Sequence, residues 1–267
     1  MRATLAAIFV LWCGPGTACA QVELRGQATP LAADVVDVSI DGVQVRNAAG
    51  ETFIVGWDRV RRVRGDFAGD ADRYSVEADR AWRARARLLR GDAVAAEPLY
   101  EELFLTYEGR RGPTAAAVAE GLLRCRLRRG VQASAVGPWL ALLRAGGVDQ
   151  PAIAEVQTVV DRQTGLAPML PPIWLSGPPV EALAREGAGS EQGPGDRVAA
   201  LRAWYVHAAA FESGSTGSTP ALPASMDSGL MLVSRVVLAR TGNVAERTAA
   251  RQWLNDQAAR SPETWEE

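Results

Sequence analysis

The chain has 267 residues, of which 48% are hydrophobic, and its formal net charge at pH 7 is −2. A chain of this length buries a substantial core, either in one domain or in a small domain joined to a larger one. A charge so close to neutral argues against a general nucleic-acid binder, because such proteins carry a clear excess of cationic side chains.

Residues 1–20 have the three parts of a signal peptide: an arginine at the second position, an apolar run, and the small-x-small sequence Ala18-Cys19-Ala20. We therefore expect cleavage after Ala20 and an exported protein of the periplasm or cell envelope that begins at Gln21. The alternative is a lipoprotein anchored at Cys19. No later stretch is long and apolar enough to span a bilayer, so no transmembrane segment is expected after cleavage.

Residues 21–64 predict a small antiparallel β module. Valine and isoleucine alternate with other residues on both sides of Asp41-Gly42, a strong hairpin signal. In a two-residue hairpin, Ile40 would face Val43 and Val38 would face Val45. Further short strands are expected at 22–24, 53–57 and 60–63. Five short strands in this space predict an SH3-like roll or a meander that docks on the first helix.

Residues 65–164 predict a helical-repeat domain, and its N-terminal end carries Asp66, Asp70 and Asp72. The spacing of these carboxylates does not match the ligand order of an EF-hand. We interpret them as residues of a helix N-terminus, where negative charge complements the helix dipole.

One pattern occurs twice in this domain, 39 positions apart. A glycine that ends one helix is followed by a small residue, an aromatic residue and a leucine that share one face of the next helix. The matched pairs are Gly91 and Gly130, Ala96 and Ala135, Tyr100 and Trp139, and Leu103 and Leu142. The sequence therefore predicts a mostly α fold in which the β module precedes a stack of helical hairpins.

The step from a small residue to an aromatic four positions later resembles the second helix of a tetratricopeptide repeat. The resemblance covers residues 68–144, with a spacing of 39 rather than about 34 residues. It implies a tetratricopeptide-like hairpin array; a generic helical hairpin array is the alternative. The segment from Val55 to Val60, with the helices through Arg129, also resembles exported uncharacterised proteins of GC-rich, planctomycete-like bacteria. That second resemblance implies localisation only.

The first long helix has two features of interest. Ala78, Trp82, Ala86 and Leu89 share one face, so we expect Trp82 to be buried, as we do Tyr100 and Trp139 on later helices. Arg80, Arg83, Arg87 and Arg90 form a neighbouring stripe, which is a candidate binding surface for a partner's carboxylates. The alternative is that these arginines pair with Glu97, Glu101 and Glu102 on the next helix or face solvent.

Three more helices are expected in this domain, at 113–129, 132–144 and 151–160. The second contains Pro138, which implies a kink or a later start. Residues 165–195, rich in proline and glycine, predict a strap across the helices, anchored by Trp174, or a linker. A short helix is expected near 180–185. Residues 196–261 predict C-terminal helices capped by Asp196, and residues 262–267 a tail.

The sequence contains no recognisable catalytic device. After export Cys125 is the only cysteine, and His207 is the only histidine of the chain; both lie in helical segments and are expected to pack there. No nucleophile elbow, zinc motif or phosphate loop is present, so we expect no catalytic residue, cofactor or metal. We predict a non-enzymatic scaffold that binds another exported or envelope protein, and no nucleic acid. The alternatives are a self-associating envelope subunit and, less favoured, an envelope hydrolase that uses carboxylates.

Overall fold

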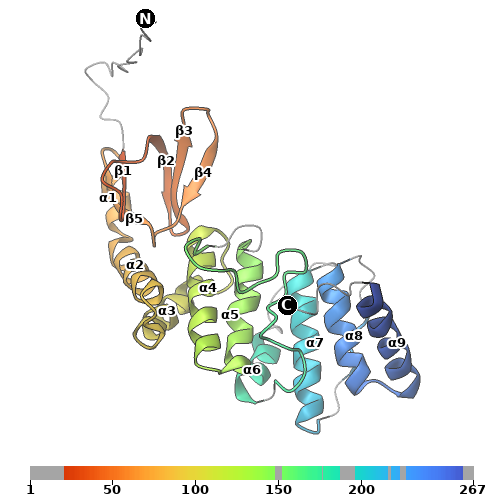
Figure 1. Ribbon diagram of the computed structural model, residues 1–267. Helices are drawn as coiled ribbons and strands as arrows, with labels where there is room; N and C mark the ends of the chain where they lie inside the picture. The colour runs from red at the N-terminus through yellow and green to blue at the C-terminus, as the bar shows by residue number, and fades with distance from the viewer. Residues whose placement is uncertain are drawn as a thin grey trace, which may run out of the picture.

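A computed structural model of the chain describes residues 21–147, 152–175, 177–186, 196–215, 218–222 and 227–260. The expected signal peptide, with its lipoprotein alternative at Cys19, and the expected tail lie outside these ranges. The protein is mostly helical, with a small antiparallel β module at the N-terminal end, which confirms the predicted fold class (Figure 1). None of the helices in the described ranges combines the length and apolarity needed to cross a bilayer.

The β module consists of five short strands in two small antiparallel sheets. One sheet pairs the first strand with the last, and the other is a meander in the order β2-β3-β4. The strands are β1 (Gln21–Leu24), β2 (Ala33–Ser39), β3 (Gly42–Asn47), β4 (Thr52–Val55) and β5 (Val60–Arg64). Val22, Val43, Val45 and Trp57 are fully or almost fully buried in a core that the module shares with the first helices.

The register of the first hairpin differs from the predicted one. Val38 pairs with Val43, and the two-residue loop is Ile40-Asp41 rather than Asp41-Gly42. Gly42 pairs with Ser39 and so begins β3, and the position requires glycine because a Cβ there would overlap the carbonyl of Val55 in β4. A bulge between Val35 and Asp37 then brings Val35 opposite Val45, so that apolar residues still face the core.

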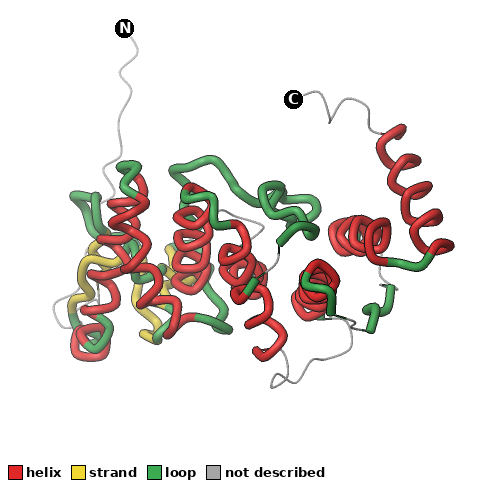
Figure 2. The backbone as a smooth tube through the Cα atoms, turned by 90° about the horizontal axis from the view of Figure 1, so that it is seen from below, coloured by secondary structure: helices red, strands yellow, loops and turns green. Residues whose placement is uncertain are grey.

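Within the described ranges, eight helices longer than two turns follow in a row that leads away from the module (Figures 1 and 2). Consecutive helices pack as hairpins, α2 with α3, α4 with α5, α6 with α7 and α8 with α9. After the short α1 (Ala68–Asp72), the helices are α2 (Ser75–Leu89), α3 (Ala93–Tyr107), α4 (Pro113–Arg128), α5 (Gln132–Ala145), α6 (Pro178–Glu186), α7 (Arg197–Glu212), α8 (Ser228–Thr241) and α9 (Val244–Arg260).

The 39-residue repeat is a structural repeat of the first two hairpins. Gly91 and Gly130 end α2 and α4 with φ angles of 85° and 73°, the left-handed conformation that favours glycine. The matched alanine, aromatic and leucine positions of α3 and α5 are all at most 2% exposed. Tyr100 and Trp139 are therefore core residues, as predicted.

Trp82 is 40% exposed, so its predicted burial is wrong. Position 82 corresponds in the repeat to Gly121 on α4, where a Cβ would overlap the ring of Tyr100 from the preceding hairpin. No hairpin precedes α2, so position 82 lies at the end of the array and has room for tryptophan. The guanidinium of Arg25 lies 4.8 Å from its ring centroid. Helix α2 instead buries Ala81, Ala84 and Leu88, one step around the helix from the predicted face.

Residues 152–175 form an irregular segment, and the helix predicted at 151–160 is absent from its described part. From here on we call residues 152–175 the strap, which begins earlier in the chain than the strap predicted at 165–195. Two backbone groups of this segment are bonded to α4: Ile153 N–H donates to Glu120, and Arg124 donates to the carbonyl of Gln157. Trp174 is 68% exposed and does not anchor the strap. The buried apolar residues of the strap are Ile153, Val160, Ala167, Leu170 and Leu175.

The remaining helices match their predictions closely. Helix α5 spans Gln132–Ala145 with Pro138 inside it, and α6 covers the short helix expected near 180–185. Asp196 caps α7 by accepting hydrogen bonds from the amides of Val198 and Ala199. His207 packs edge-on against Trp204, as expected for a packing residue.

Candidate binding site at the junction of the β module and the helices

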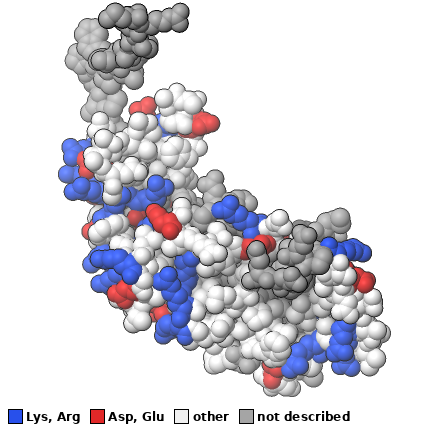
Figure 3. Space-filling view, in the orientation of Figure 1, with Lys and Arg blue, Asp and Glu red and all other residues white. Residues whose placement is uncertain are grey.

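The four arginines proposed as a binding stripe make contacts mainly with their own hairpin. Arg80 Nε lies 3.0 Å from Glu102 Oε2, which is one of the ion pairs considered above. Arg83 and Arg90 each donate to a carbonyl one turn back in α2. Arg87 Nη1 donates to the carbonyl of Ala95 at 2.8 Å. Figure 3 shows basic and acidic side chains intermingled at this end of the molecule rather than a uniform basic surface.

The contact of Arg87 is repeated in the next hairpin. Arg126, 39 positions later, donates through Nη1 to the carbonyl of Ser134 at 2.5 Å. In both hairpins an arginine in the last turn of the first helix thus bonds a carbonyl in the first turn of the second helix. This equivalence indicates that Arg87 stabilises the hairpin turn.

The acidic residues of α3 pair mostly with α4 instead of α2. Glu97 Oε2 lies 2.8 Å from Arg129 Nε, and Glu101 Oε1 lies 3.3 Å from Arg126 Nη2. Only Arg80 of the proposed stripe joins them. The acidic face of α3 therefore helps to join the first two hairpins.

A cavity lies where the β module meets the helices. Its volume is about 660 Å³. One wall is β4 and the turn after it, and the opposite wall is the start of α4, the end of α5 and the first residue of the strap. The lining residues are Phe53, Ile54, Val55, Gly56, Asp58, Arg59, Gly112, Pro113, Ala116, Ala145, Gly146, Gly147 and Ala152.

Local sequence explains why this cavity is open. Gly146 ends α5 in the left-handed conformation, and Gly112 precedes α4 with a φ of 99°. Because these turns carry no side chains, the helical wall is backbone and small residues. Phe53 and Ile54 on the facing strand are 42% and 40% exposed. In the described chain, β4 pairs only with β3, so its other edge carries unpaired backbone groups.

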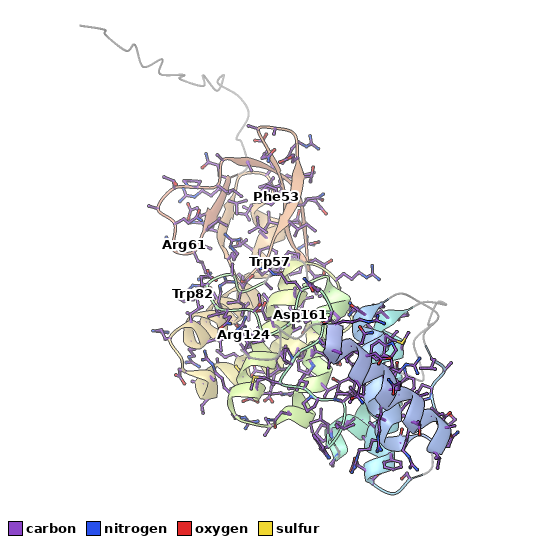
Figure 4. The ribbon with its side chains drawn as sticks, turned by 45° about the vertical axis from the view of Figure 1, so that its right-hand side comes forward. Phe53, Trp57, Arg61, Trp82, Arg124 and Asp161 are labelled. Atoms are coloured by element: carbon purple, nitrogen blue, oxygen red, sulfur yellow. The ribbon has the colours of Figure 1, made fainter. Side chains whose placement is uncertain are left out.

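The module is fixed firmly beside this cavity. Trp57 stacks on Tyr74 with ring centroids 5.1 Å apart, and Figure 4 shows it at the boundary between module and helices. Buried Thr114 of α4 accepts a hydrogen bond from Trp57 N–H and donates one to the carbonyl of Asp41. Tyr107 O–H donates to the carbonyl of Ile40. A segment bound in the cavity would therefore meet two preformed walls.

A buried ion pair that sequence reasoning did not single out adjoins the cavity, and one of its members, Asp58, lines it. Arg85 of α2 is 7% exposed and Asp58 is 4% exposed. Arg85 Nη1 bonds Asp58, and Arg85 Nη2 bonds Glu155 of the strap at 2.5 Å. One guanidinium thus joins the module, the array and the strap. The repeat could have identified Arg85, since it matches Arg124 at the same 39-residue interval.

Burial and charge act in opposite directions on the pKa values of this pair. Burial raises the pKa of Asp58 above its ordinary value, although the Arg85 cation opposes the shift. Burial alone would lower the pKa of Arg85, but Asp58 and Glu155 outweigh it and raise that pKa. We interpret the contact as an ion pair whose Asp58 carboxylate depends on Arg85 for its charge.

The described residues contain no cluster of potential metal ligands. No three of their His, Cys, Asp and Glu side chains gather closely enough to hold a metal ion. Cys125 is fully buried, as predicted, and burial raises the pKa of its thiol to about 12. His207 Nε2 lies 3.2 Å from the hydroxyl of Thr241, a contact between neighbouring helices.

The Cys125 thiol should resist alkylation in the folded protein because it is both enclosed and protonated. We expect no mass shift after treatment of the processed native protein with iodoacetamide at pH 8, and one carbamidomethyl adduct after unfolding in guanidinium chloride. Rapid modification of the native protein would contradict this placement of α4.

No family model, curated protein or solved structure matches this chain.

Proposed function

We propose that this protein is an exported, non-enzymatic scaffold that binds an extended segment of another exported or envelope protein at the junction cavity. The observation that carries the proposal is the free edge of β4, with exposed Phe53 and Ile54, along a preformed cavity. An unpaired strand edge binds a peptide by adding it as a further strand, and the pockets beside it select side chains.

The dimensions favour one extended segment as the occupant. The four residues of β4 span about 13 Å, at roughly 3.3 Å per residue. The volume of about 660 Å³ lies within the range of about 300–1,000 Å³ common for binding pockets. Because the helical wall is glycine- and alanine-rich backbone, it favours small or slender apolar side chains.

Ile54→Lys tests this proposal directly. A lysine on an edge strand is a device by which natural sheets block strand addition, and an exposed side chain can change without loss of the core. We expect at least a tenfold loss of partner capture with the melting temperature unchanged. The measurement is photo-crosslinking from a residue-53 probe in the native envelope, followed by mass spectrometry of the adducts.

The matched control is Val94→Lys, which places the same charge at an apolar side chain of α3 that is 74% exposed. This control should leave the adducts of the residue-53 probe unchanged. Equal adducts from Ile54→Lys and the parent protein would refute strand addition at β4. Adducts made only of this chain would instead support the envelope subunit.

A further inference from the structure

The strap lies on the first helices of the repeated hairpins and is held there by polar groups. Figure 1 shows the strap in green, between α5 and α6 in the chain, and Figure 4 labels Arg124. Arg124 Nη2 donates to the carbonyl of Gln157 at 2.7 Å, and Arg85 Nη1 donates to the carbonyl of Ala152 at 3.3 Å. Glu120 accepts from Ile153 N–H at 3.1 Å. The helices therefore hydrogen-bond the backbone of the strap between residues 152 and 157.

The two arginines occupy equivalent positions in successive repeats and make equivalent contacts. Arg85 and Arg124 lie 39 positions apart, and each is 7% exposed. Each is oriented by a buried carboxylate, Asp58 for Arg85 and Glu120 for Arg124. Each then directs a remaining N–H to a strap carbonyl. A repeated and pre-oriented donor set is a surface suited to polypeptide, because its contacts do not depend on most of the bound side chains.

The strap itself shows which chemistry the surface accepts. The Ile153 side chain is fully buried, and a turn links Val156 N–H to the carbonyl of Ile153. Two positions after Ile153, the Glu155 carboxylate bonds Arg85 while its side chain stays 55% exposed. The recognised pattern is thus an aliphatic residue, then a carboxylate two positions later, in a short turn.

We propose that residues 152–157 are a displaceable internal ligand, and that the Arg85–Arg124 surface binds a turn with the Ile-x-Glu pattern from a partner protein. The surface is closed in the isolated chain because a tethered ligand acts at an effective concentration near millimolar. A partner segment gains access when the strap loses its Ile153 contact. This surface adjoins the junction cavity at Asp58 and Ala152, but it does not include the β4 edge and does not rest on the function proposed above.

A peptide added in trans tests the exchange. The probe is a fluorescein-labelled peptide with the sequence of residues 152–160, and the proteins are the full processed chain and its Ile153→Asp variant. Because aspartate cannot occupy the apolar site, we expect the variant to bind the probe at least tenfold more tightly than the parent, measured by fluorescence anisotropy. A probe that carries Glu155→Gln should bind the variant about tenfold more weakly, since it loses a charge-assisted hydrogen bond.

Two further measurements decide the remaining outcomes. Ile54→Lys introduced into the Ile153→Asp protein should leave probe binding unchanged, which separates this surface from the β4 edge. If Ile153→Asp fails to fold, hydrogen exchange of the parent protein decides. The amides of Ile153 and Val156 should exchange through an opening smaller than global unfolding. Exchange only by global unfolding, equal probe binding by both proteins, or no binding by the folded variant would overturn the proposal.

Discussion

Trp139→Ala should lower the free energy of unfolding by about 3–5 kcal/mol, because it removes a large side chain from the centre of the core. Trp139 is fully buried, its Nε1–H donates to the carbonyl of Gly165, and its ring lies 5.2 Å from that of Tyr205. It thus connects α5, the strap and α7. Urea denaturation monitored by circular dichroism should show the loss as a lower urea concentration at the midpoint of unfolding.

The matched control is Trp82→Ala, the same substitution at the exposed end of the array. It removes the contact with Arg25 and should cost only about 0.5–1 kcal/mol. Equal losses at the two positions would show that the assigned faces of α2 and α5 are wrong.

Arg85→Met should cost about 3–5 kcal/mol, because it leaves the Asp58 carboxylate buried without its cation. Glu155 is exposed enough to turn to solvent, so Asp58 dominates the penalty. The double variant Asp58→Leu/Arg85→Met should recover most of the loss, since an apolar pair needs no counter-charge. Thermal and urea unfolding of the single and double variants provide the measurement.

The same variant should show a distinctive pH dependence. Without Arg85, burial raises the pKa of Asp58 further, because only weaker effects, such as that of Arg59, still oppose it. A folded-state pKa above the unfolded value of about 3.9 gives a stabilising contribution that is full below the unfolded pKa and is lost as pH rises through the folded pKa. Arg85→Met should therefore lose less stability at pH 4 than at pH 7. A deficit independent of pH would contradict the role assigned to Asp58.

The sequence predicted the repeat because the repeat is local. Glycine with a left-handed backbone at 91 and 130, and the small-to-aromatic step after each, depend on helix geometry within one hairpin. Both positions could be identified without knowledge of the neighbours. The same holds for the Asp196 cap and for α6.

The buried face of α2 was not predictable from periodicity alone. Alanines at 78, 81, 84 and 86 give this helix two faces of similar apolarity, and Trp82 marks the wrong one. The choice depends on what precedes α2, which is a β module rather than a helical hairpin. The helix predicted at 151–160 was wrong for a related reason, since Glu120 and Arg124 contact this segment across 33 residues of sequence.

The candidate site depends on still longer separations. The junction cavity is formed by β4, α4, α5 and the strap, and no local pattern reports that these segments meet. Arg85 looked like one more arginine in an arginine-rich helix. Its difference from Arg83 lies in burial, which only the packed structure reveals.

The exchange of Gly121 for tryptophan at position 82 also limits how such an array can grow in evolution. A hairpin duplicated ahead of α2 would bring an aromatic ring onto Trp82, where the next repeat has only a hydrogen atom. Such an insertion would need a second change, to a small residue, before it could fold. A hairpin added beyond α9, where Ala250 is the one buried residue of the last helix as described, meets no such obstacle. The array therefore has a fixed beginning, and additional repeats are accommodated more readily at its C-terminal end.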